Sequence, residues 1–278
     1  MMKPEINVDY YLKLIADILL ESGMQVKDFG LVNGKMGISV FLFHYARYSG
    51  NLMYKDYAVA LIEEIQQQTY DSNHYNYAHG LAGVGIGIDY LAQNDFITVG
   101  KDILDDFDDK LRYVTFSDCF GDFSLYTGLT GYGRYWQSRV GRTDTDVLMN
   151  QILDAISKKI TKLDEKDQFD VFCFLFDLNH LSLYSQRTRW MLHSCKQYCN
   201  HIANCIPEMS FPRLGYTISG KMIRKYLLNK YLNIDWYSFK MVMNEEITNL
   251  EIQEGLSTYG LCLLNSVSPR DISWIGLF

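Results

Sequence analysis

The chain has 278 residues, of which 48% are hydrophobic and 21% charged, a composition that excludes a disordered protein. Its formal net charge of -7 excludes the broad basic surface of a nucleic-acid-binding protein, so we expect no nucleic-acid partner. The longest apolar runs are far from the roughly 20 residues that span a bilayer, and acidic residues interrupt any secretory signal at the N-terminus. Together with six scattered cysteines, these features predict a cytoplasmic protein with reduced thiols and no membrane association.

Two kinds of helical segment are expected to alternate along the chain. Amphipathic segments begin near Tyr10, Leu52, Gly100, Asp144, Arg187 and Phe239, at intervals of about 42 to 52 residues. Between them, more uniformly apolar segments are expected near 35–48, 85–93, 131–139, 170–184, 214–231 and 257–266. A helix with a single apolar stripe belongs on the outside, and one that is apolar nearly all round belongs inside.

A glycine-bearing phrase introduces several of the apolar segments. It reads Gly80-Leu81-Ala82-Gly83-Val84-Gly85 and then Gly128-Leu129-Thr130-Gly131-Tyr132-Gly133, with a looser copy opening at Gly30 and a degenerate copy at Gly255. The first three copies begin 50 and 48 residues apart, a period typical of helical-hairpin repeats. Glycine permits tight turns and close backbone approach where such helices converge.

These features predict an all-α fold, an α/α toroid of about six inner and six outer helices, formed as a single domain over 1–278. The C-terminal segment is apolar rather than polar, which favours a closed ring over an open array with a polar cap.

The run from Gly30 to Ile38, followed by Phe43-His44-Tyr45-Ala46-Arg47-Tyr48, resembles the opening of lanthionine synthetase C-like (LanC-like) proteins. The phrases that begin at Gly80 and Gly255 agree with this resemblance, which extends over nearly the whole chain. It implies a toroid of inner and outer helices. The family's cyclases add a cysteine thiol of a precursor peptide to dehydroalanine or dehydrobutyrine, and a zinc ion held by Cys, Cys and His activates the thiol.

The family's zinc ligands lie in a Trp-Cys-Tyr-Gly phrase and a later Cys-His-Gly phrase, and this sequence contains neither. Its later copies instead read Leu214-Gly215-Tyr216-Thr217 and Glu254-Gly255-Leu256-Ser257. We therefore expect no metal and no cofactor. We expect the protein to bind a ribosomally made peptide or to assist its maturation, without zinc-dependent cyclisation. Expected partners are a precursor peptide or a peptide-modifying enzyme.

His79 is the first candidate functional residue, because the resemblance places it where a family histidine before glycine serves as an acid or base. The alternative is a histidine that hydrogen bonds at a helix entrance. Candidate peptide contacts are the tyrosines at the inner helix starts (Tyr75, Tyr77 and Tyr132) and the basic residues Arg224 and Lys225. The tyrosine rings would otherwise fill the toroid axis, and the basic residues would otherwise form a solvated helix face.

Asp118 and Asp122 support a different hypothesis, a carbohydrate-active α/α-barrel enzyme with an acid and a base at the barrel mouth. Loop aspartates also hold turns through their own side chains. A cluster of His193, Cys195, Cys199, His201 and Cys205 has too wide a spread around one helix to bind a single ion, which favours core packing. The acidic run from Asp105 to Asp109 is expected to form a solvated helix face.

Overall fold

The computed structural model describes residues 7–32, 34–100, 102–117, 121–142 and 144–205, together with Leu256, Ser257, Gly260, Leu261, Leu263, Leu264, Val267 and Leu277. This part of the chain contains helices and no strand. The helices are α1 (Val8–Ser22), α2 (Lys35–Ser49), α3 (Leu52–Tyr70), α4 (Leu81–Gln93), α5 (Asp105–Val114), α6 (Leu129–Ser138), α7 (Thr145–Lys159), α8 (Glu165–His180) and α9 (Ser185–Cys205), with a 3-10 turn, η1 (Gly23–Gln25), after α1.

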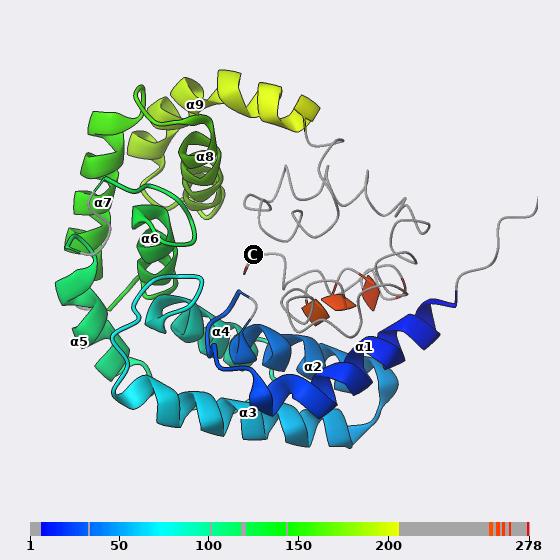
Figure 1. The fold of residues 1–278 in the computed structure, drawn as a ribbon. Coiled ribbons are helices and arrows are strands. Elements are labelled where there is room, and N and C mark those ends of the chain that lie inside the picture. The colour runs from blue at the N-terminus through cyan, green and yellow to red at the C-terminus, as the bar shows by residue number, and fades with distance from the viewer. Residues whose placement is uncertain are drawn as a thin grey trace, which may run out of the picture.

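The helices form two concentric layers (Figure 1). The helices α3, α5, α7 and α9 lie outside α2, α4, α6 and α8, which face the centre. Burial follows the same division. Helix α2 is buried at every position from Lys35 to Ala46, whereas α3 buries only a stripe that includes Ala58, Leu61 and Ile65. An outer helix needs one apolar stripe and an inner helix needs apolar character on most sides. The predicted all-α, two-layered toroid is confirmed.

Two inner helices, α4 and α6, each pack a glycine against an aromatic ring of the next inner helix. A Cβ on Gly85 of α4 would lie 2.6 Å from the Tyr135 ring of α6, and one on Gly133 of α6 would lie 2.7 Å from the Phe174 ring of α8. Gly260, in the helical residues after Leu256, meets the Phe41 ring of α2 in the same way. The last described helical residues therefore contact the first inner helix, as a closed ring requires. The C-terminus lies at the centre of the ring in Figure 1, where the Tyr77 hydroxyl donates a hydrogen bond to the Leu277 carbonyl (2.6 Å).

The helices predicted near 214–231 and from Phe239 lie outside the described residues. The count of six helix pairs and the single domain over 1–278 therefore stay predictions.

The glycine phrases begin the inner helices, but in a register that differs from the one read from sequence. Gly34, Gly80 and Gly128 are the N-cap residues of α2, α4 and α6, each in an extended backbone conformation. The structural equivalent of Gly80 in the first copy is thus Gly34 and not Gly30, so the copies are 46 and 48 residues apart. In each copy the first helical amide bonds a carbonyl seven residues earlier, as Leu81 does to His74 (3.0 Å).

The loops that precede α2, α4 and α6 are joined in series by hydrogen bonds. The Val32 amide donates to the Ala78 carbonyl (3.0 Å), and the Ala78 amide donates to the Tyr126 carbonyl (3.0 Å). The series continues through the Leu125 amide, which donates to a carboxylate oxygen of Asp170 on α8 (2.8 Å). We call this series the loop ladder. It satisfies backbone amides that would otherwise be buried without partners.

Helix α8 enters the ring without a glycine phrase and begins earlier than the predicted residue 170. Asp164 caps it by accepting a hydrogen bond from the Asp167 amide (2.8 Å). An aspartate N-cap is among the strongest helix start signals, which explains the early start. In the loops before α4 and α6, a backbone carbonyl accepts the hydrogen bond from the preceding loop. At α8 the acceptor is instead the side-chain carboxylate of Asp170.

Candidate functional site

The candidate site is a pair of side chains from two neighbouring loops at the glycine-phrase end of the ring. Asp28 precedes α2 and His79 precedes α4, and a carboxylate oxygen of Asp28 is hydrogen bonded to Nδ1 of His79. The other carboxylate oxygen accepts a hydrogen bond from the Gly30 amide (2.7 Å), and the His79 amide donates to the Asn76 side chain (2.8 Å). Both members of the pair are therefore held by their own loops.

Close packing of the two loops keeps the pair together. A Cβ on Gly30 would overlap the Ala78 carbonyl and the His79 Cα. Only a residue without a side chain allows this approach, so the glycine sets the distance between Asp28 and His79. The sequence marks Gly30 only as the first glycine of the first phrase and does not reveal this role in the contact between the two loops.

The pair has the properties of an oriented acid or base. A carboxylate at Nδ1 favours the imidazole tautomer that carries its proton there, so proton exchange with a bound molecule would pass through Nε2. The His79 side chain is 50% exposed and the Asp28 side chain 32%, so a peptide can reach the imidazole from solvent. The pairing with Asp28 fits both sequence hypotheses for His79, a hydrogen-bonding histidine at a helix entrance and an acid or base, so the acid/base role stays a prediction.

The candidate tyrosines have different environments. Tyr75 is half-buried and its hydroxyl donates to the Asn73 side chain (3.3 Å). Tyr77 and Tyr132 are buried, with 1% and 0% of their surface exposed. Peptide contact by Tyr77 and Tyr132 conflicts with this burial, because their rings have no surface to offer, and they fill the axis of the ring instead. Arg224 and Lys225 lie outside the described residues.

Asp122 is a turn-forming residue in this structure. One carboxylate oxygen accepts a hydrogen bond from the Ser124 amide (2.8 Å) and the other accepts from the Thr127 hydroxyl (2.6 Å). Its carbonyl accepts from the Leu129 amide (2.9 Å), which starts α6. Asp122 thus has the same position before α6 that Asp28 has before α2. Its second carboxylate oxygen, however, accepts a hydrogen bond from its own loop, whereas that of Asp28 bonds His79 of the next loop. Asp118, its proposed catalytic partner, lies outside the described residues.

The expected absence of zinc stays a prediction, because most of the two later phrases, at 214–217 and 254–257, lies outside the described residues. The described residues contain no group of three or more His, Cys, Asp or Glu side chains that could hold a metal ion. The thiols of Cys173 and Cys195 are both buried, and burial raises the pKa of Cys195 to about 11, which keeps it protonated at neutral pH. Burial of these two thiols, which lie on different helices, favours their role in core packing. The side chains of Cys199, His201 and Cys205 lie outside the described part of the chain.

A buried ion pair inside the ring went unnoticed in the sequence. Arg134 of α6 and Asp177 of α8 are 2.9 Å apart and both more than nine-tenths buried. Burial alone would lower the pKa of Arg134, but the negative charge of Asp177 outweighs burial and raises it. Nε and Nη2 of Arg134 have no hydrogen-bond partner among the described residues. Arg134 is the one charged residue of α6, Asp177 lies among other acidic residues of α8, and nothing in the sequence spacing links the two.

The arrangement defines a class of protein: a two-layered α/α toroid whose inner helices begin at glycine phrases and carry an Asp–His pair at that end. The family model for lanthionine synthetase C-like protein matches residues 25–183, more than half of the chain. The chain belongs to the lanthionine synthetase C-like family. A search of proteins with curated descriptions gave no match. Within the described residues, every helix is too short or too polar to cross a membrane.

Proposed function

We propose that the protein takes part in the maturation of a ribosomally synthesised peptide by binding it at the Asp28–His79 pair, without zinc-dependent thioether cyclisation. Membership of the LanC-like family supports the relation to peptide modification. Binding without cyclisation is supported by a site that has its expected histidine but lacks the expected zinc-ligand phrases. His79, which the resemblance aligns with the family's acid/base histidine, has an aspartate partner, while the sequence has neither of the phrases that supply zinc ligands.

The consequence is a protein equipped for one part of the family chemistry. In thioether formation, a cysteine sulfur bonds to Cβ of a dehydro residue, and the resulting carbanion takes a proton at Cα. His79 has the geometry to hold or deliver that proton. The thiol itself needs deprotonation, which a metal would promote at neutral pH. Without such a metal the thiol stays largely protonated, so we expect binding without efficient ring closure.

Metal analysis of the purified full chain tests the absence of zinc. After dialysis against zinc and then against metal-free buffer, we expect far less than one zinc per chain. Stoichiometric zinc that disappears after a Cys→Ala change would overturn this part of the proposal.

A synthetic peptide with one dehydroalanine and one cysteine tests binding and chemistry together. We expect fluorescence anisotropy to report binding, while alkylation with iodoacetamide shows the peptide thiol still present after incubation. His79→Phe and Asp28→Asn should each weaken binding. His193→Asn is the matched control, because His193 is an exposed histidine on α9. Loss of the alkylatable thiol with unchanged peptide mass would mean that cyclisation does occur, and equal binding by all variants would remove the Asp28–His79 pair from the site.

The alternative of a carbohydrate-active enzyme has no observation in its favour. It requires a carboxylate at the barrel mouth that is available to a sugar, and both carboxylate oxygens of Asp122 are engaged within their own loop.

A further inference from the structure

A cavity of about 670 Å³ lies between the outer helices α3 and α5, over the outward face of the inner helix α4. Its volume is within the range of about 300–1,000 Å³ that is usual for ligand pockets. The cavity is lined by side chains of α3, α4 and α5 and by the connection between α4 and α5. None of these residues belongs to the Asp28–His79 pair, so the cavity is a separate feature of the outer wall.

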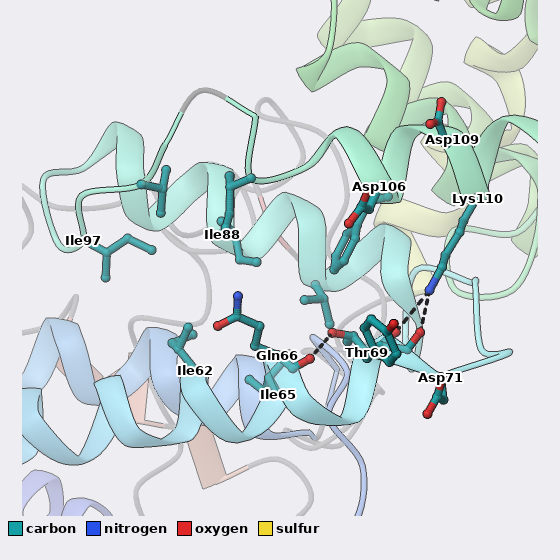
Figure 2. Close-up of a pocket in the computed structure, with 15 residues that line it drawn as sticks. Ile62, Ile65, Gln66, Thr69, Asp71, Ile88, Ile97, Asp106, Asp109 and Lys110 are labelled. Carbon is teal, nitrogen blue, oxygen red and sulfur yellow. Dashed lines mark hydrogen bonds between the residues drawn. The ribbon is translucent and has the colours of Figure 1, made fainter.

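The cavity has an apolar end and an acidic end. Figure 2 shows Ile62, Ile88 and Ile97 together at one end. Asp71, Asp106 and the neighbouring Asp109 lie at the other end, along with Lys110 and Thr69. Branched aliphatic side chains from three separate elements form the apolar end, which can accept an aliphatic group of a ligand away from water.

The single cation at the acidic end is already engaged. Lys110 Nζ donates hydrogen bonds to the carbonyls of Tyr70 (2.8 Å) and Thr69 (3.5 Å), the last residues of α3. It therefore caps the C-terminus of α3, where a positive charge is favourable. Asp71 and Asp106 are exposed, and Asp109 has only a distant partner, Arg112 at 3.9 Å. The rim is thus acidic, in a chain that is acidic overall.

A polar group stands between the two ends. Gln66 of α3 directs its side-chain amide into the cavity beside Ile62 and Ile65 (Figure 2). The amide makes no hydrogen bond with any described residue, although the Gln66 carbonyl accepts one from Thr69. A primary amide offers both donors and an acceptor, which can pair with exposed backbone or side-chain polar groups of a bound peptide.

We propose that this cavity binds a basic amphipathic peptide segment, whose aliphatic side chains enter the isoleucine-lined end and whose lysine or arginine side chains pair with the acidic rim. Charge complementarity selects this occupant. A fatty acid or an anionic lipid would place its negative group beside Asp106 and Asp109, where like charges repel it. The inference goes beyond the proposed function and does not depend on it, because it concerns the outer wall and none of the residues of the Asp28–His79 pair.

The test is fluorescence anisotropy with a short labelled peptide in which pairs of leucine and lysine alternate. We expect saturable binding to the full chain that weakens as sodium chloride is raised, because exposed ion pairs are screened by salt. Ile62→Trp should fill the apolar end. Excluding one leucine side chain costs about 1.5–3 kcal/mol, so binding should fall about tenfold or more. Replacing Asp106 and Asp109 together by Asn should weaken binding about two- to tenfold, as expected for exposed pairs.

Two control variants distinguish the cavity from the rest of the surface. Asp56→Asn removes an exposed carboxylate from the same helix α3 outside the cavity lining, and Leu52→Ser removes an exposed apolar side chain (67% exposed) from the first turn of α3. Both should bind the probe as the unchanged protein does. Thermal unfolding of each variant verifies that it is folded.

Three results would overturn the proposal. The first is absence of saturable binding, and the second is unchanged binding by a folded Ile62→Trp variant. The third is equal binding of a matched peptide with glutamate in place of lysine, which would show apolar adsorption without charge selection. Because the dehydroalanine peptide assay probes Asp28 and His79, either proposal can fail while the other stands.

Discussion

Gly80→Ala is a direct test of the glycine phrase, because the nearest atoms to a Cβ on Gly80 are all backbone. A Cβ at this position would lie 2.6 Å from the Asn76 amide nitrogen and 2.6 Å from both the carbonyl carbon and oxygen of His74. These atoms cannot move aside as a flexible side chain does. The His74 carbonyl accepts from the Leu81 amide (3.0 Å), and the Asn76 carbonyl accepts from the Gly80 amide (3.1 Å), so relief of the clash breaks bonds that start α4.

The expected cost has two parts that add. Overpacking against a rigid wall costs about 1–3 kcal/mol, and alanine is a poorer N-cap than glycine by about 0.5 kcal/mol or more. We therefore expect the free energy of unfolding to fall by about 2 to 3 kcal/mol, which lowers the Tm by roughly 5 to 10 °C for a domain of this size. Peptide binding at the neighbouring His79 should weaken as well.

Urea denaturation and thermal melts followed by circular dichroism measure this cost. Gly100→Ala is the matched control, since a Cβ there would meet nothing within 4 Å. Its expected effect is within about 0.5 kcal/mol. If Gly80→Ala unfolds at the same urea concentration and temperature as the unchanged protein, the steric account of the phrase is wrong.

Two further predictions concern charges. Asp177→Ala leaves the buried Arg134 guanidinium uncompensated, so unfolding in urea should show a loss of about 3–5 kcal/mol, while combining Asp177→Leu with Arg134→Met should recover much of it. Burial would raise the pKa of Asp17, but hydrogen bonds from Lys13 and Tyr54 outweigh burial and lower it below 3.8. A carboxyl with a lowered pKa stabilises the fold above its ordinary pKa and loses this effect as the pH falls through the folded value. Asp17→Asn should thus be less stable than the unchanged protein at pH 7, and the difference should shrink below pH 3.8; a constant difference across that range would contradict the assignment.

The helices were predictable from sequence because their signals are local. Apolar periodicity and the glycine phrases located α2, α4 and α6 closely, since each depends on residues within a few turns of one another. The register of the first copy was off by four residues because two glycines compete as the helix start. Only the structure shows that Gly34 caps α2 while Gly30 supports the contact between Asp28 and His79.

Long-range pairs account for most of what the sequence did not reveal. His79 was identifiable from its phrase, but Asp28 is 51 positions away and no pattern connects them. The acidic run of α5 shows the same limitation. The prediction of a solvated face holds at Asp106 but is wrong at Asp108, which is buried and accepts hydrogen bonds from Tyr135 (2.5 Å) and Arg139 (2.9 Å) of the α6 region. A charge is recognised as buried only when its partner is known.

The loop ladder sets a limit on where this chain can tolerate changes of length. Its members are joined amide to carbonyl across Val32, Ala78 and Tyr126, and the same seven-residue step leads into each helix. An inserted or deleted residue in one of these loops would displace the groups that bond the neighbouring loops and the step that starts the following helix. In the described residues of the connections at the opposite ends of the helices (94–100, 102–104 and 139–142), the backbone hydrogen bonds are local and do not join one connection to the next. We therefore expect insertion scanning to divide the ring into one end that accepts extra residues and one end, the end with Asp28 and His79, that rejects them.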